Sequence, residues 1–239
     1  MKKREPIIMS WSGGKDSCLA LHAMREAGDV EVTALITTIT DGFDRVSMHG
    51  VRRELLREQC DCIGIPLHEV RLSTASSYEE YSARTTEAFT SYLPGISRVA
   101  FGDLFLEDLK LWRDKQLAAI GMTAHYPLWK MDTTLLAKQF IEDGFKAVLV
   151  CVDGKKLDAN FAGREYDLQL LCDLPGDVDP CGENGEFHTL VYDGPIFKRP
   201  LGICSGERVT RDQFHYCDFC GPGAEKSAGI SEFNPPVMK

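Results

Sequence analysis

The stretch Ser10-Trp-Ser-Gly-Gly-Lys-Asp-Ser-Cys18 lies between a short apolar run and a helical pattern. The apolar run at residues 6–10 predicts a buried strand, and the spacing of apolar residues over 16–27 predicts an amphipathic helix. Gly13 and Gly14 allow the backbone to turn tightly between the two elements. Strand, glycine turn and helix in this order predict the opening unit of an α/β fold.

Apolar runs and helical patterns continue to alternate beyond this unit. They predict strands at 30–38, 67–72, 98–101 and 125–128, and helices at 50–63, 78–92 and 106–120. Gly28, Gly64 and Gly121 follow three of the helices, where a left-handed backbone favours glycine. This alternation predicts a Rossmann-like α/β fold: a doubly wound, five-stranded parallel sheet with helices on both faces.

The pattern changes after about residue 130. A helix is predicted at 132–143 with Asp132 as its N-cap, and strands are predicted at 145–152 and 187–192, with a proline- and glycine-rich stretch between them. We therefore expect a nucleotide-binding domain at 1–130 and a smaller α+β domain at 131–222. The remaining residues, 223–239, are small, polar and proline-bearing, which predicts a flexible tail.

Composition narrows the classes of partner and compartment. The 239 residues carry a net charge of −9, which argues against nucleic acid or an anionic membrane as a partner. The sequence shows no secretory signal and no apolar run long enough to span a bilayer, so we expect a cytoplasmic protein. In that reducing compartment the nine cysteines are expected to be free thiols. The oligomeric state stays open, a homo-oligomer included.

The opening turn has the features of an anion site. It follows a strand, it begins a helix whose positive end faces the turn, and it carries the hydroxyls of Ser12 and Ser17 and the charge of Lys15. Phosphate best fits so many converging donors. The spacing matches neither a Walker A loop nor a dinucleotide fingerprint. Asp16 fits as a residue of the first helical turn or as a ligand of a magnesium ion that accompanies a polyphosphate.

A second stretch, Asp-Pro-Cys-Gly-Glu-Asn-Gly-Glu-Phe-His-Thr over residues 179–189, places Glu183 and Glu186 in a glycine-rich turn before a strand. Carboxylates there could orient an ammonium ion, bind magnesium or act as a base on an amine. A solvated acidic turn is the alternative interpretation of such a pair.

The opening loop resembles the pyrophosphate-binding loop of the N-type ATP pyrophosphatases, which cleave ATP between the α and β phosphates. The second stretch is similar to the motif of the diphthine–ammonia ligase family, close to Gly-Glu-Gly-Gly-Glu-Tyr-Glu-Thr. The matching residues are Gly182, Glu183, Gly185, Glu186 and Thr189, and the departures are Asn184, Phe187 and His188. Segments beginning at Ser47 and Phe101 also match, so the resemblance covers roughly residues 7–200.

The resemblance implies ATP-dependent adenylation of a carboxylate with release of pyrophosphate, followed by displacement of AMP by ammonia. In archaea and eukaryotes that carboxylate belongs to diphthine, a modified histidine on a translation elongation factor. If the source organism makes no diphthamide, a related bacterial carboxylate takes its place.

The resemblance also implies roles for particular residues. The ATP-binding set is Ser10, Ser12, Gly13, Gly14, Lys15, Asp16, Ser17, Thr37, Thr38, Ser47, Met48, His49 and Gly102, with Mg²⁺ at Asp16. The catalytic set is Lys15, Asp103, Glu183 and Glu186. The set that contacts the carboxylate substrate and ammonium is Glu183, Asn184, Glu186 and Thr189. Gly102 and Asp103 follow the fourth predicted strand, and the ends of parallel strands line the ligand crevice of such sheets.

Two other functions fit the same loop. One is a tRNA-modifying sulfurtransferase, for which Cys217 and Cys220 would supply the chemistry; the acidic charge and the lack of a basic stripe argue against it. The other is a nucleotide-binding sensor without turnover, which the presence of Lys15 and Glu183 disfavours. A structural role is the favoured interpretation of the two cysteines.

Overall fold

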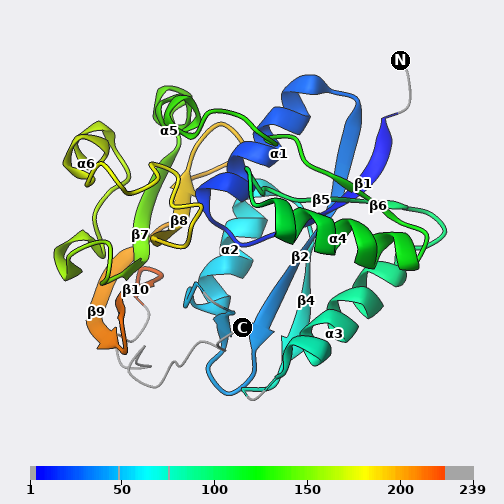
Figure 1. Ribbon diagram of the computed structural model, residues 1–239, viewed down its shortest axis with the longest axis horizontal. Helices are drawn as coiled ribbons and strands as arrows, with labels where there is room; N and C mark the ends of the chain where they lie inside the picture. The colour runs from blue at the N-terminus through cyan, green and yellow to red at the C-terminus, as the bar shows by residue number, and fades with distance from the viewer. Residues whose placement is uncertain (1–3, 48, 75, 224–239) are drawn as a thin grey trace.

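The computed structural model describes residues 4–47, 49–74 and 76–223. Met48, predicted to bind the nucleotide, and all of the predicted tail except Gly223 lie outside the described residues. Two β-sheets, one mainly parallel and one antiparallel, form the framework of the fold (Figure 1).

The first sheet contains five parallel strands in the order β4-β2-β1-β5-β6, which is the doubly wound order of a Rossmann-like fold. The strands are β1 (Glu5–Ser10), β2 (Val30–Thr40), β4 (Leu67–Leu72), β5 (Arg98–Ala100) and β6 (Thr123–His125). The predicted α/β class and the five parallel strands are therefore confirmed.

A short antiparallel strand, β3 (Arg45–Val46), is added at one point of this sheet. The pairing of β1 with β2 ends at Ser10 and Ile36, but β2 continues to Thr40. One edge of this extension of β2 pairs with β4, so β3 pairs with the other edge, on the side where β1 lies. The β3 segment therefore lies directly beyond the carboxyl end of β1, next to the glycine-rich turn.

Helices cover both faces of the parallel sheet. Helices α1 (Lys15–Ala27) and α2 (Arg53–Ile63) lie between the two sheets, and α3 (Tyr78–Thr90) and α4 (Glu107–Ala119) cover the opposite face (Figure 1). The glycines that follow α1, α2 and α4 have φ values of 68°, 79° and 74°, as the sequence predicted. Two separate apolar clusters fill the two faces, and the larger one continues from the parallel sheet into the second sheet.

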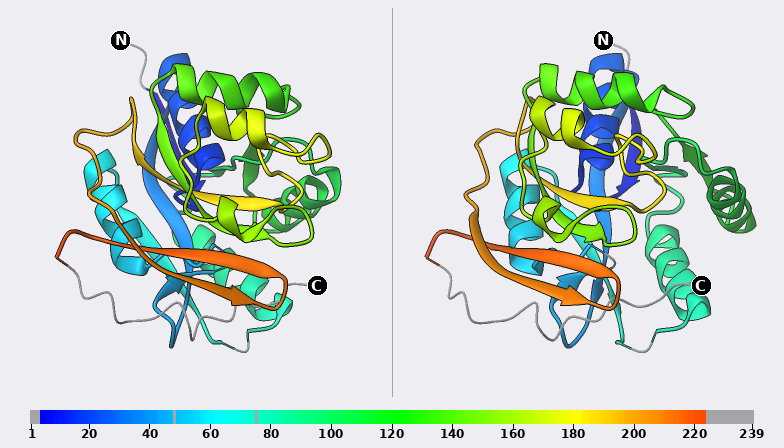
Figure 2. Two further views of the ribbon diagram at one scale, coloured as in Figure 1. Left: turned by 90° about the vertical axis from the view of Figure 1, so that its left-hand side faces the viewer. Right: turned by 60° about the vertical axis from the view of Figure 1, so that its left-hand side comes forward.

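The second sheet is antiparallel, with the order β8-β7-β10-β9. Its strands are β7 (Lys146–Asp153), β8 (Phe187–Asp193), β9 (Cys204–Arg211) and β10 (Phe214–Cys220). Helices α5 (Thr133–Glu142) and α6 (Leu168–Asp173) and the 3₁₀ turn η1 (Ala159–Phe161) complete this half. Figure 2 shows the β9–β10 hairpin, in orange and red, below the helices of this half. The domain boundaries at 130 and 222 stay a prediction.

Several elements differ from their predictions for identifiable reasons. Strand β6 ends at His125, whereas 125–128 was predicted, because Pro127 has no N–H to donate to a ladder. Strands β9 and β10 were not predicted; β9 is an exposed edge strand of mostly polar residues, and β10 is mostly buried. The predicted cap is confirmed, since the Asp132 carboxylate accepts a hydrogen bond from Leu135 N at 2.9 Å. Within the described ranges, no helix combines the length and the apolar character that a membrane span requires.

Candidate active site

The glycine-rich turn joins β1 to α1 and is folded around two hydroxyl groups. Ser12 Oγ and Ser17 Oγ are 3.0 Å apart, and Ser12 Oγ also accepts a hydrogen bond from Gly14 N at 3.2 Å. Gly13 has a φ of 77°, and a Cβ there would lie 2.6 Å from Leu56, so glycine is required both by conformation and by space. Gly14 is the N-cap of α1 and brings no side chain to that helix end. The positive end of α1 therefore faces the turn.

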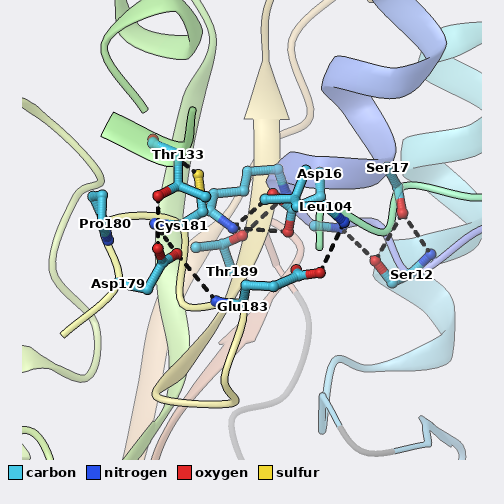
Figure 3. Close-up of polar contacts among 12 residues, drawn as sticks. Ser12, Asp16, Ser17, Leu104, Thr133, Asp179, Pro180, Cys181, Glu183 and Thr189 are labelled. Atoms are coloured by element: carbon cyan, nitrogen blue, oxygen red, sulfur yellow. Dashed lines mark hydrogen bonds and ion pairs between the residues drawn. The ribbon is translucent and has the colours of Figure 1, made fainter. Parts of the chain in front are cut away.

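The second sheet holds this turn through backbone and side-chain hydrogen bonds. Thr189 Oγ1 in β8 accepts from Lys15 N at 3.0 Å (Figure 3). Val191 N, in the same strand, donates to Gly13 O at 3.0 Å. Gln59 in α2, fully buried, donates to the carbonyl oxygens of Gly13 and Val191 at 2.9 and 2.6 Å and accepts from the Trp11 indole at 3.0 Å. The turn is thus fixed between α2 and β8 before any ligand binds.

A cavity of about 540 Å³ opens at the carboxyl ends of the parallel strands. Its polar end is lined by the turn, by the end of β2 and by the loop that precedes β8. Its other end is apolar and lies between α3 and α4, where Tyr81, Phe89 and Trp112 line it. Gly102 at the end of β5 approaches the turn so closely that a Cβ would lie 2.9 Å from Asp16 O. A side chain at position 102 would therefore displace the turn.

Lys15 crosses the polar end of the cavity and pairs with its neighbour. Its Nζ lies 2.8 and 2.7 Å from the two carboxylate oxygens of Asp16, and only 3% of the lysine is exposed. Burial alone would lower the pKa of Lys15, but the Asp16 carboxylate offsets burial and holds this pKa above its ordinary value. The ammonium group is therefore charged and lies 5.6 Å from the centre of the Phe187 ring.

Glu183 faces Lys15 and Asp16 from the loop before β8. Its Oε1 accepts a hydrogen bond from Leu104 N at 2.8 Å, which ties that loop to the segment after β5 (Figure 3). Burial raises the pKa of Glu183 from 4.5 to about 7, and the carboxylates of Asp16 and Asp103 act in the same direction. This carboxyl can therefore gain or lose a proton near neutral pH.

Glu186 has a different environment from Glu183. It is only 2% exposed and accepts hydrogen bonds from Asp179 N at 3.1 Å, Asn184 N at 2.9 Å and Asn184 Nδ2 at 3.0 Å. Neither Glu186 nor Asn184 lines the cavity. Their side chains shape the turn that presents Glu183.

Two imidazoles form a further wall of the cavity. The rings of His49 and His188 meet edge to face with their centres 4.4 Å apart. Burial, followed by the charge of Lys15, lowers the pKa of His49 to about 4, and burial lowers that of His188 well below its ordinary value. Both rings are therefore neutral at pH 7. Within the described part of the chain, His49 Nδ1 and the buried Thr37 Oγ1 have no hydrogen-bond partner.

Most of the predicted site residues meet at this cavity. Those that line it are Ser10, Ser12, Gly14, Lys15, Asp16, Ser17, Thr37, Thr38, Ser47, His49, Gly102, Asp103, Glu183 and Thr189. Gly13 belongs to the turn but does not line the cavity, and its carbonyl oxygen accepts hydrogen bonds from α2 and β8. Asp103 forms an ion pair at 3.2 Å with Arg113 of α4, a residue that the sequence analysis did not identify.

Comparison with known protein families gives two adjacent matches. The diphthamide synthase N-terminal domain matches residues 5–124, and the diphthamide synthase C-terminal domain matches residues 132–220. The chain belongs to the diphthamide synthase family. The family expected from the loop and from the Glu183 stretch is thereby confirmed.

Individual relatives have low identity but long matches. A protein of Schizosaccharomyces pombe named diphthine–ammonia ligase is 24% identical over 86% of this chain, which covers 37% of that protein's length. Proteins of the same name from Danio rerio and Homo sapiens are 25% and 22% identical, over 83% and 89% of this chain and 86% of each relative. Among solved structures, a U34-tRNA thiolase, NcsA, from Methanococcus maripaludis with its [4Fe-4S] cluster aligns with a TM-score of 0.36 at 15% identity, over 58% of each chain.

Cys217 and Cys220 lie in β10 and are buried. Cys217 Sγ is 3.7 Å from Ser205 Oγ, and Cys220 Sγ is 3.8 Å from Cys204 O. Among the described residues, no three or more His, Cys, Asp or Glu side chains lie together in a way that could hold a metal ion. The two thiols pack within the second sheet.

Proposed function

We propose that this chain is an ATP-dependent ligase that adenylates a substrate carboxylate and then forms an amide with ammonia. One observation carries the proposal: a single cavity has the turn at the N-terminus of α1 on one wall and the Glu183 carboxyl on another. The first wall suits the phosphates of a nucleotide, and the second suits an amine. A ligase of this kind must hold the nucleotide and the amine next to the same substrate carboxylate.

The residues of the turn would bind the departing pyrophosphate. The Ser12 and Ser17 hydroxyls and the positive end of α1 face it, and Lys15 is charged and already placed at the cavity wall. Thr37 Oγ1, buried and without a partner among the described residues, supplies a further polar contact for the nucleotide. Asp16 is the carboxylate that would hold magnesium, since Mg²⁺ bound to a polyphosphate needs only one or two protein carboxylates. That ion would neutralise phosphate charge.

The substrate carboxylate is itself the nucleophile toward the α-phosphate, so the first step needs no general base. Holding the reactants in line and neutralising phosphate charge supply most of the rate. The new carboxyl–phosphate bond forms as the bond between the α and β phosphates breaks, and pyrophosphate leaves from the turn.

The second step needs ammonia in its neutral form. Ionised Glu183 takes a proton from ammonium, and the ammonia that remains attacks the acyl carbon. The bond from that carbon to AMP breaks, AMP leaves, and the second proton that the nitrogen loses passes to the released phosphate or to solvent. A pKa of about 7 allows Glu183 to accept this proton and to release it again near neutral pH.

The acceptor follows from the relatives' names. They act on diphthine, so diphthine on a translation elongation factor is the acceptor we propose for a source organism that makes diphthamide. A related carboxylate takes its place in an organism that does not.

The test is to incubate the protein with ATP, magnesium chloride, ammonium chloride and a diphthine-bearing elongation factor, and to follow the phosphorus products by ³¹P NMR. We expect equal amounts of AMP and pyrophosphate, together with a mass change in the factor that corresponds to exchange of a carboxylate for an amide. Release of ADP and orthophosphate would contradict adenylation. ATP binding without any turnover would indicate the sensor instead.

A further inference from the structure

A short hairpin forms the wall of the cavity beyond the end of β1. It runs from Arg45 to Arg52, which face each other as an isolated antiparallel bridge, and Val46 N donates to Val51 O at 2.8 Å. Ser47 and His49, between these ends, line the cavity. Whatever fixes the base of this hairpin also fixes these two side chains.

Both guanidinium groups at the base converge on one carboxylate in the second sheet. Asp218 Oδ1 accepts from Arg45 Nη1 at 2.8 Å, and Asp218 Oδ2 accepts from Arg52 Nη2 at 2.6 Å and from Arg52 Nε at 3.1 Å. The exposed fractions of Arg45, Arg52 and Asp218 are 3%, 7% and 2%. The contact is therefore a buried ion triad between residues far apart in the chain.

The triad is tied to the hairpin in a second way. Arg45 Nη1 also donates to Gly50 O at 2.7 Å, so the guanidinium group held by Asp218 is bonded directly to the backbone of the hairpin. Arg52 has a further contact with Glu54 at 3.5 Å, but 60% of the Glu54 side chain is exposed. Asp218 is thus the strong partner of Arg52, and the exposed Glu54 offers a matched control substitution.

The second sheet holds the hairpin at both ends. Asp218 in β10 holds its base, and the His188 ring in β8 packs against His49 near its tip. A forked guanidinium bound at two points permits little movement, and separating buried opposite charges is costly. The hairpin cannot shift relative to the second sheet without breaking this contact.

We propose that Asp218 is a positioning residue for ATP: by holding Arg45 and Arg52 it sets Ser47 and His49 at the nucleotide-binding wall of the cavity. The inference rests on the proposed function, because it takes ATP as the ligand of that cavity. Within Cys217-Asp-Phe-Cys220, the inference gives a role to the aspartate: Asp218, and neither thiol, connects β10 to the site.

The test measures binding of α,β-methylene-ATP, which cannot be cleaved between its α and β phosphates, by titration calorimetry with magnesium chloride. We expect Asp218→Asn to raise the dissociation constant roughly tenfold, equivalent to about 1.4 kcal/mol. Asp218→Glu restores the charge and should recover part of the affinity. Glu54→Gln, which removes the exposed partner of Arg52, should stay within about twofold of the wild type.

A steady-state measurement separates positioning from general destabilisation. In Asp218→Asn the KM for ATP should rise while kcat at saturating ATP is largely kept, whereas partial unfolding would lower kcat and leave the KM unchanged. If Asp218→Asn does not fold, Arg52→Lys takes its place in the test. This variant keeps the positive charge but loses the forked guanidinium group, and its dissociation constant for α,β-methylene-ATP should rise.

The outcomes separate the two proposals. Wild-type affinity in a folded Asp218→Asn protein, or in Arg52→Lys if the first does not fold, would overturn the positioning role and leave the proposed ligase activity standing. Failure of the wild-type protein to bind the ATP analogue would overturn the proposed function and this inference with it.

Discussion

Replacing Glu183 with glutamine should stabilise the folded protein at alkaline pH and have no such effect at acid pH. In the folded state burial raises the pKa of Glu183 from 4.5 to about 7. Between these two values the folded protein holds the proton more tightly than the unfolded chain does. The stabilising contribution of the protonated carboxyl is therefore fully present below pH 4.5, and it is lost as the pH rises through 7.

The size of the effect follows from the same two values. A difference of roughly 2.5 pKa units corresponds to a free energy of about 3 kcal/mol. Glutamine has nearly the same shape, keeps an oxygen to accept the hydrogen bond from Leu104 N, and carries no charge at any pH. We expect Glu183→Gln to raise the free energy of unfolding by about 3 kcal/mol at pH 8 and by nearly nothing near pH 4.5.

Urea unfolding followed by tryptophan fluorescence at a series of pH values measures this difference. Glu186→Gln is the matched control, because it makes the same chemical change three residues away. There the amide NH₂ group would face N–H donors of Asp179 and Asn184, so this variant should be less stable than the wild type throughout the series.

If Glu183→Gln raises the free energy of unfolding equally at both ends of the pH series, or does not raise it at pH 8, then Glu183 is not held in a site that disfavours its charge. The same variant should lose amide formation while still binding ATP. Stability gained where activity is lost is the pattern expected of a functional carboxyl.

Four further variants test other parts of the protein. Lys15→Met should lower pyrophosphate release by roughly 100-fold or more, because a buried charge facing the phosphates is lost; an unaffected rate in a coupled pyrophosphate assay would exclude the turn as the phosphate site. Thr189→Val leaves the buried Lys15 N without its acceptor and should cost about 1–3 kcal/mol of stability, measured by thermal or urea unfolding, together with ATP affinity; unchanged values would mean that the Thr189 side chain does not hold the turn. Cys217→Ser and Cys220→Ser should keep amide formation in a folded protein, and its loss would show that the thiols have more than a structural role.

Local patterns were sufficient to predict the parallel half of the fold. The turn around Gly13 and Gly14 is specified by its own residues, and the glycines after α1, α2 and α4 terminate those helices through their own conformation. The second sheet was only partly predicted, since neither β9 nor β10 was identified. β9 is an exposed, mostly polar edge strand, so its apolar alternation is weak, whereas β10 was missed although most of its residues are buried. β3 has two residues, too few for any periodicity to show.

The partners of the site residues were harder to predict than the residues themselves. Thr189 lies 174 positions from the Lys15 amide that it holds, and Asp218 lies 166 positions from Arg52. Periodicity tells which face of a strand a residue occupies but not which distant element packs on that face. Gln59 did leave a signal, since it is a polar residue on the otherwise apolar face of α2. A buried amide on such a face must find partners, and here these are the turn and β8.

Glu183 and Glu186 belong to the same motif but have different surroundings. Glu186 is enclosed by three hydrogen bonds from its own turn, so its carboxylate is committed to shaping that turn. Glu183 lines the cavity and faces the carboxylates of Asp16 and Asp103, which make its ionisation unfavourable. Two chemically identical side chains three residues apart therefore lie in different environments: hydrogen bonds from its own turn surround Glu186, and carboxylates face Glu183 across the cavity. In the proposed function, Glu186 therefore fixes the turn that places Glu183 in the cavity, and the raised pKa of Glu183 comes from its surroundings there and not from the motif itself.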